Sequence, residues 1–318
     1  MNRPSACLLG TVLSASVLIT CPLLQAQTPE QNAAEKPAAE KPVVRTRWMN
    51  VLRAGNYKLT GTQPSARPAD KAKAAQPPRE TTAKDLESVD EQKATGSMLG
   101  VTVWRMRPAE ESDEVKFRVG DRFVTPVQVK SDTSLREGDR VRLTIEVPQS
   151  GYLYVIDREQ YADGSMGPPT LIFPTRQLLQ GDNAVNEKAL LSIPDVDSTP
   201  PFFTLTRRKP NLVAEVILVL VSSEPLPGIG VGRNASLTEV QLREEQVKEW
   251  TDKWAGRASR FDLASGEGRP MESEQVLVVT RTRALVHEDP NPQTVYWLPE
   301  AEPGTPLMIS IPLVIGSE

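Results

Sequence analysis

Nucleophilic catalysis and zinc binding both depend on residue types that this chain almost lacks. His287 is its single histidine, and Cys7 and Cys21 are its only cysteines. A Ser-His-Asp or Cys-His site needs an imidazole beside the nucleophile, and zinc sites are built mostly from several His and Cys ligands. We therefore expect no catalytic triad, no metal site and no bound cofactor. His287 is interpreted as a surface residue in a polar loop.

Acidic residues are abundant, and one run of them partly follows the pattern of a calcium-binding loop. Asp157, Glu159, Tyr161 and Asp163 alternate before Gly164. A calcium loop needs an oxygen ligand at its fifth position, glycine at its sixth and glutamate at its twelfth, and this run has none of the three. We interpret it as a solvated acidic turn. Paired carboxylates can also hydrolyse glycans, but only a measured separation identifies such a pair. A cryptic glycan hydrolase is therefore our third and least favoured function, and we expect no enzyme.

Aromatic and basic side chains supply the candidate binding surface. Two tryptophans one helical turn apart could stack on a sugar, although such a stripe more often packs in a core. Two tyrosines in a strand and another tryptophan offer further stacking surfaces. A basic turn that precedes Pro210 could contact an anionic glycan or lipid headgroup, although a hairpin tip is the commoner explanation. The candidate residues are Trp104, Tyr152, Tyr154, Arg207, Arg208, Trp250 and Trp254.

A β-hairpin is expected to organise the elements that position these residues. Tyr152–Ile156 is rich in aromatic and β-branched residues, which favour strands. A loop around Asp163-Gly164 follows, from about Arg158 to Pro169, and residues 170–173 return as the second strand. Residues 140–147 alternate strictly, with Val141, Leu143, Ile145 and Val147 predicted to be buried and Arg142, Thr144 and Glu146 solvated. Residues 212–221 are apolar except for Glu215, which predicts a central strand covered on both faces.

Other short strands are predicted at residues 101–104, 115–119, 124–129, 190–193, 202–206, 275–283 and 307–315. The period changes between Ser236 and Phe261. Ser236 and Glu239 have the spacing of a capping box, and apolar residues then recur at helical intervals. The fold class expected is mainly β: an antiparallel β-sandwich with one long amphipathic helix, about residues 236–261, packed on it.

The segment 115–227 resembles a known family. The residues that carry the likeness are Gly138-Asp139, Gly151 to Ile156, Leu171 to Pro174 and Glu224-Pro225-Leu226. In this combination they resemble domain of unknown function 4384, a β-rich module found in exported bacterial proteins and joined to kinase-like or peptidase-like domains. The resemblance implies a fold and brings no catalytic residues with it.

The N-terminal residues indicate export. Arg3 precedes a largely apolar run that ends at Leu24-Gln25-Ala26, which fits a cleaved signal peptide over residues 1–26. Lipidation at Cys21 and an uncleaved anchor are the alternatives, and membrane contact is expected only in those two cases. Residues 27–95 repeat AAEKP and are rich in Ala, Lys, Glu and Pro, which predicts a disordered linker. Its island Val43–Leu59 is either a docking segment or a piece that packs on the domain.

Charge differs between the linker and the domain that follows at residues 96–318. The linker holds 12 Lys or Arg and 9 Asp or Glu, whereas the domain holds 24 and 32. The acidic domain disfavours nucleic acid as a partner, because phosphate binding needs clustered cations. We expect an exported, periplasmic or extracellular, non-catalytic module that binds an unidentified component of the bacterial cell envelope. A carbohydrate- or peptidoglycan-binding module is the alternative.

Overall fold

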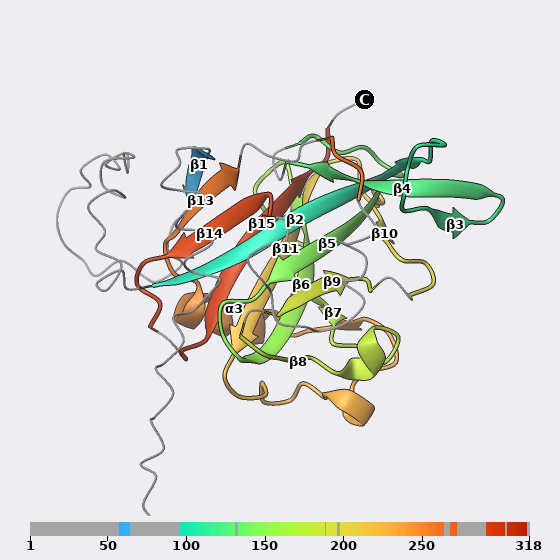
Figure 1. Cartoon of the computed structure of the whole chain (residues 1–318). Helices are drawn as coiled ribbons and strands as arrows, with labels where there is room; N and C mark the ends of the chain where they lie inside the picture. The colour runs from blue at the N-terminus through green and yellow to red at the C-terminus, as the bar shows by residue number, and fades with distance from the viewer. Residues whose placement is uncertain are drawn as a thin grey trace, which may run out of the picture. The chain divides into compact units, whose positions relative to one another are not determined.

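A computed structural model describes residues 57–63, 96–130, 133–187, 189–195, 198–263, 268–271, 291–302 and 304–316 of the chain (Figure 1). For residues 57–63 it describes the backbone alone. The predicted signal peptide, most of the predicted linker, the predicted strand 275–283 and His287 lie outside these residues. Within them the protein is mainly β, with two antiparallel sheets and one α-helix. None of the helices in this part combines the length and the hydropathy that a membrane crossing requires.

The two sheets contain nine and six strands among the described residues. The larger sheet consists of β1 (Tyr57–Gln63), β2 (Ser97–Pro108), β3 (Phe117–Val119), β4 (Arg122–Val129), β5 (Arg140–Glu146), β9 (Leu190–Ile193), β10 (Phe203–Thr204), β13 (Ala258–Leu263) and β14 (Thr294–Leu298). The smaller sheet consists of β6 (Gly151–Tyr161), β7 (Thr170–Phe173), β8 (Ala184–Val185), β11 (Leu212–Ser222), β12 (Val240–Gln241) and β15 (Leu307–Val314).

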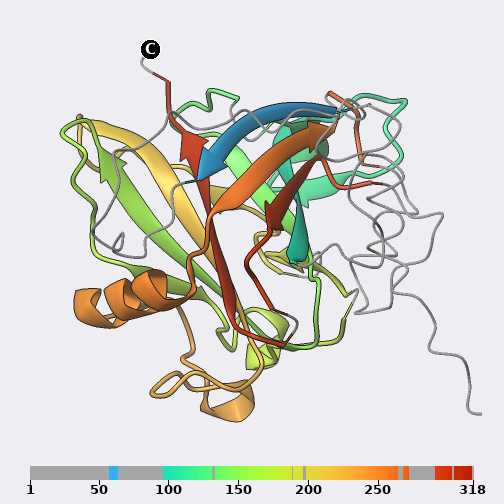
Figure 2. The ribbon, with the colours of Figure 1, turned by 90° about the vertical axis from the view of Figure 1, so that its left-hand side faces the viewer.

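Strand β2 is the spine of the larger sheet (Figure 1). Its first part, Ser97 to Val101, pairs with β14, and its second part, Val103 to Pro108, pairs with β4. Residues 100–105 also pair with β5. One long strand therefore joins three neighbours, and the sheet curls around it (Figure 2). In the smaller sheet, β11 lies between β6 and β15 and pairs with both along nearly its whole length.

The main core lies between the inner faces of the two sheets. The larger sheet contributes side chains such as Leu99, Leu143 and Ile145, and the smaller sheet contributes Val219 and Ile311. A second apolar cluster lies on the outer face of the smaller sheet, and it includes Val247 and Trp250 of helix α3 (Glu244–Trp254) together with side chains of β6 and β11. Figure 2 shows the helix beside this sheet. Strand β11 is therefore buried on both faces, and this confirms the prediction for residues 212–221.

The predicted helix over residues 236–261 is wrong in length. Only Glu244–Trp254 is helical, and Ser236 and Glu239 do not form its cap, since the cap position is Arg243 with an extended backbone. Val240 and Gln241 pair with β7, and the last residues of the predicted helix form β13, which pairs with β14. Backbone pairing in the sheets overrides helix propensity, which is a weak preference.

The organising hairpin is present, but its first strand is longer than predicted. Strands β6 and β7 pair in antiparallel fashion, and Gly164 occupies the turn with φ +82°. The prediction that a loop starts near Arg158 is wrong, because β6 continues to Tyr161 and pairs with β11 throughout. This extension places Asp157 and Glu159 in a strand, so they do not form a solvated acidic turn.

The alternation predicted for residues 140–147 is correct for the inner face and wrong for the outer one. Arg142, Thr144 and Glu146 are all buried. The Arg142 guanidinium donates to Ser192 Oγ and to the Pro194 carbonyl, and the ring of Phe117 lies 5.4 Å from it. Its burial lowers the pKa of Arg142 to about 10. Residues far apart in the sequence therefore cover a face that the local pattern predicted to be solvated.

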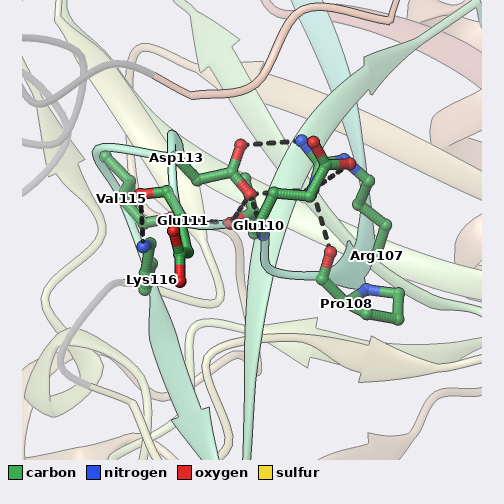
Figure 3. A network of polar contacts seen from close by, with 8 residues as sticks. Arg107, Pro108, Glu110, Glu111, Asp113, Val115 and Lys116 are labelled. Carbon is green, nitrogen blue, oxygen red and sulfur yellow. Dashed lines mark hydrogen bonds and ion pairs between the residues drawn. The ribbon is translucent and has the colours of Figure 1, made fainter.

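An ion pair between the half-buried Arg107 and the buried Asp113 fixes the loop between β2 and β3 (Figure 3). The guanidinium of Arg107 donates one hydrogen bond to each oxygen of Asp113, and both bonds are 2.7 Å long. The same carboxylate accepts from the backbone N–H of Glu110 and from Thr125 Oγ. The bond with Arg107 is the largest of the effects that lower the pKa of Asp113 from 3.8 to about 2.

Part of the segment expected to be a linker joins the larger sheet. Residues 57–63, which include the end of the island Val43–Leu59, form β1 and pair with β13 from Tyr57↔Leu263 to Gln63↔Ala258. This segment therefore pairs with the domain itself.

Candidate functional site

A pocket of about 300 Å³ opens between the two sheets at one end, and we call it the end pocket. The larger sheet supplies walls from β5 and β10, and the smaller sheet supplies walls from β6, β7, β11 and β15. The walls combine apolar side chains with polar ones, among them four carboxyl groups and one guanidinium. The lining side chains used below are Leu143, Asp157, Glu159, Thr206, Arg208, Glu215, Ile217, Glu239 and Leu313.

Strand register brings three of the carboxyl groups together. In the ladder between β6 and β11, Glu159 lies opposite Glu215, and Asp157 lies opposite Ile217. Asp157 and Glu215 are therefore diagonal neighbours on the same face of the sheet, within reach of each other's side chains. This face is the inner one, so the three carboxyls continue the stripe of core residues toward the pocket. Like charges placed directly opposite each other destabilise a sheet, and removal of charge by protonation relieves that cost.

The pKa values of Asp157 and Glu215 are both raised above the ordinary values of these groups. Burial is the largest cause and the charge of Glu159 the next, and together they raise the pKa of Asp157 from 3.8 to about 6. Burial, followed by the charges of Asp157 and Glu159, raises the pKa of Glu215 from 4.5 to about 8. A hydrogen bond between the two groups lowers the first pKa and raises the second. At neutral pH the pair therefore holds one proton, mainly on Glu215.

Glu159 is stabilised separately by a chain of side chains. Lys209 Nζ donates to Tyr161 Oη over 2.8 Å and also lies over the Tyr161 ring. The Tyr161 hydroxyl in turn donates to Glu159 Oε2. The exposed Arg208 lowers the pKa of both Asp157 and Glu215 through space. Arg208 and Lys209 of the basic turn therefore act near the pocket. Their charges do not remove the proton shared by Asp157 and Glu215.

Two kinds of chemistry can be compared with this geometry. In glycoside hydrolases the two carboxyls stand roughly 5–9.5 Å apart on either side of the scissile bond. Asp157 and Glu215 stand side by side on one face of the sheet, which does not match an arrangement on either side of a bond. Across the residues that the structure describes, no three His, Cys, Asp or Glu side chains are arranged to hold a metal ion. The pocket is suited to binding a group that can replace the shared proton.

No known relative decides between these possibilities. No family model, curated protein or solved structure matches this chain. The resemblance of residues 115–227 to domain of unknown function 4384 stays a prediction.

A second pocket, of about 460 Å³, lies beside the C-terminal end of α3, and we call it the Trp254 pocket. Trp254 and Leu298 provide apolar surface, and charged side chains surround them. The charged residues are Lys253, Arg257, Glu300 and Glu302. One half-buried tryptophan lies here among cations and carboxylates, and Lys253 Nζ lies 5.3 Å from the centroid of its ring.

Three of the aromatic residues proposed for ligand stacking are buried. Trp104 lies buried on the outer face of the larger sheet, where its indole N–H donates to Thr144 Oγ. Tyr154 has no exposed surface, and its hydroxyl accepts the backbone N–H of Leu226 over 2.9 Å. Trp250 packs in the cluster beneath α3, which is the core role that the helical stripe favoured. None of the three presents a ring face to solvent.

The other candidates are distributed over separate parts of the domain. Trp254 is half-buried and stacks on Trp250, with 6.3 Å between ring centroids, while it lines its own pocket. Tyr152 is half-buried against the cluster under α3. Arg207 donates to the Gly316 carbonyl, so it ties the basic turn to the end of β15. Only Arg208 lies in the end pocket.

The pair of Asp157 and Glu215 was not foreseen as a site. The sequence did contain a signal for it, because Glu215 is the one charged residue in the apolar run 212–221. A charge in a strand that is covered on both faces needs a partner or a proton. Its neighbour on β6, however, depends on the register, which the local sequence does not specify.

Proposed function

We propose that this protein is an exported, non-catalytic binding module of the bacterial cell envelope, built as a β-sandwich behind a linker of which residues 57–63 join the sheet. The observation that carries the proposal is the end pocket, a mixed apolar and acidic recess between two otherwise closely packed sheets. Ligand sites in proteins are typically concave and mostly apolar, with a few polar groups that fix orientation. The end pocket is concave and has apolar walls, and it carries more polar groups than a typical site.

The signal-like first 26 residues and the Lys/Glu/Pro-rich segment support the exported and tethered part of the proposal. The resemblance to a β-rich module of exported bacterial proteins agrees with it. An unidentified envelope component is the proposed ligand.

A variant with a plugged pocket tests the proposal. Thr206 lies exposed at the rim of the end pocket, and Thr206→Trp fills the entrance without altering the core. Immobilised wild-type and variant domains would be incubated with solubilised envelope, and the bound proteins, lipids and glycans quantified by mass spectrometry. We expect at least one component to be retained by the wild type and lost from the variant. The exposed Ser223→Trp is the matched control. Identical retention by all three proteins would refute the end pocket as the binding site.

Glycan binding is the second candidate function, and the Trp254 pocket favours it. Trp254→Ala removes the ring from that pocket, whereas Trp104→Phe alters a buried tryptophan outside it. Sedimentation with purified cell wall should carry down the wild type and the Trp104→Phe control, and leave Trp254→Ala in solution. Equal sedimentation of all three would remove this candidate.

A further inference from the structure

We propose that the end pocket binds its ligand through a primary ammonium group on an aliphatic stem, and that binding releases the proton shared by Asp157 and Glu215. This inference rests on the proposed function and names the chemical class of the ligand.

The first argument is that the carboxyl pair lacks a donor. Glu215 is only 9% exposed, and its Oε2 is buried without a hydrogen bond from any donor among the described residues. Asp157 Oδ1 is buried in the same way. Buried carboxylates are costly unless they are paired, so the proton they share at present is the least expensive way to satisfy them. A cation that enters the pocket would take its place.

The second argument is the balance of charge around the pair. Four carboxyl groups line the pocket, contributed by Asp157 and Glu159 of β6, Glu215 of β11 and Glu239 from the segment before β12. The Tyr161 hydroxyl already engages Glu159, and Lys209 supports that hydroxyl. Among the residues that the structure describes, Arg208 is the one cation that lines the pocket, and it is exposed. The carboxyl groups of the pocket therefore outnumber its cations, and a further positive group would reduce the excess of negative charge.

The third argument is the shape of the site. The free oxygens of Asp157 and Glu215 belong to two carboxyl groups on neighbouring strands, so they are separate acceptors. An ammonium group has three donors around one nitrogen and can bond acceptors from separate groups, whereas a guanidinium suits a planar, bidentate acceptor. Leu143, Ile217 and Leu313 line the pocket and would pack against the stem. A volume of about 300 Å³ is at the small end of ligand sites and accommodates a head group with its stem.

The proton balance of the step is simple. Before binding, the O–H of Glu215 donates to Asp157, and the pair carries a single negative charge. When an R–NH₃⁺ group enters, the O–H bond breaks, its proton passes to water or buffer, and both carboxylates accept hydrogen bonds from the ammonium. The ligand keeps its own proton. One proton is released for each ligand bound, so the affinity should rise about tenfold per pH unit while Glu215 is protonated in the free protein.

Isothermal titration calorimetry with n-hexylamine, n-hexanol and hexanoate tests the inference. The probes share a stem and differ in head group, and each titration is repeated in two buffers with different ionisation enthalpies. For hexylamine at pH 7 we expect release of about one proton, and an affinity about tenfold higher at pH 7.5 than at pH 6.5. We expect much weaker binding of hexanol and none of hexanoate.

Variants of the same shape locate the effect. Glu215→Gln keeps the size of the side chain but cannot ionise, so it should abolish the proton release and weaken hexylamine at least tenfold. Glu224→Gln, at an exposed site elsewhere, removes the same charge and should behave as wild type. A peptide that presents one lysine should compete with hexylamine if the natural ligand is a side chain.

The outcomes separate this inference from the proposed function. If hexanol binds as tightly as hexylamine, without proton release, the pocket is a binding site but the ammonium specificity is wrong. Failure of hexylamine to bind the wild type also overturns the inference. In both cases the comparison of Thr206→Trp with wild type still decides the proposed function.

Discussion

Replacement of Glu215 by glutamine should change the dependence of stability on pH in a defined direction. In the unfolded chain this carboxyl ionises near 4.5, whereas in the folded protein its pKa is about 8. Between these values unfolding releases a proton, so the free energy of unfolding of the wild type falls as pH rises. The stabilisation is fully present below about pH 4.5 and is lost by about pH 8. Glu215→Gln stays neutral throughout and lacks this loss.

The size of the effect follows from the change in acidity. A tenfold change in acidity is worth about 1.4 kcal/mol, which gives an upper limit of about 5 kcal/mol for Glu215. The pocket opens to solvent and its charges are screened, so less than half of that, about 2 kcal/mol, is a realistic expectation. For a domain of this size each 1 kcal/mol moves the melting temperature by about 2–4 °C.

Differential scanning calorimetry between pH 5 and pH 8.5 measures this difference. The melting temperature of the wild type should fall about 4–8 °C relative to Glu215→Gln across that range. The two proteins should be nearly equal at pH 5, and Glu224→Gln should run parallel to the wild type. Parallel curves for wild type and Glu215→Gln would show that Glu215 ionises normally, and the account of the carboxyl pair would be wrong.

Three further predictions concern other parts of the chain. Asp113→Asn should reduce the free energy of unfolding by about 2 kcal/mol in urea at pH 7, because a hydrogen bond to a buried charged group is lost. This deficit should shrink as pH falls from about 4 to about 2, where Asp113 of the wild type becomes protonated. A deficit that does not change with pH would contradict the lowered pKa of Asp113. Gly151→Ala should destabilise the domain by about 2 kcal/mol in the same assay, since its Cβ would lie 2.2 Å from the Ser222 carbonyl oxygen, and unchanged stability would refute that close approach. Mass spectrometry of the exported protein should find Gln27 as the first residue; a lipidated Cys21 or an intact N-terminus would replace cleavage after Ala26.

Local sequence patterns predicted most strands of the domain and the burial of β11. They did so because period-two alternation and continuous apolar runs record which faces of a strand are covered. They missed β14, in which Tyr296 lies on the core side, and they assigned the residues of β13 to a helix. Both segments owe their conformation to pairing with strands distant in the sequence.

The candidate site was less accessible to sequence reasoning than the fold. Asp157 and Glu159 looked like part of a turn, and Glu215 looked like a single exception in an apolar strand. Their meeting depends on the register of β6 against β11, which the ladder between two long strands sets. The aromatic residues, by contrast, drew attention through their chemistry, but Trp104 and Tyr154 are buried in smaller apolar clusters outside the main core.

The pairing of β2 with β14 has a consequence for how the domain assembles. The backbone N–H of Gln293 donates to Thr102 Oγ, which is 191 positions earlier in the chain. Contacts between such distant residues slow folding, because a long loop must close before they contribute any stability. Strand β2 therefore stays incompletely paired until almost the whole domain has been synthesised.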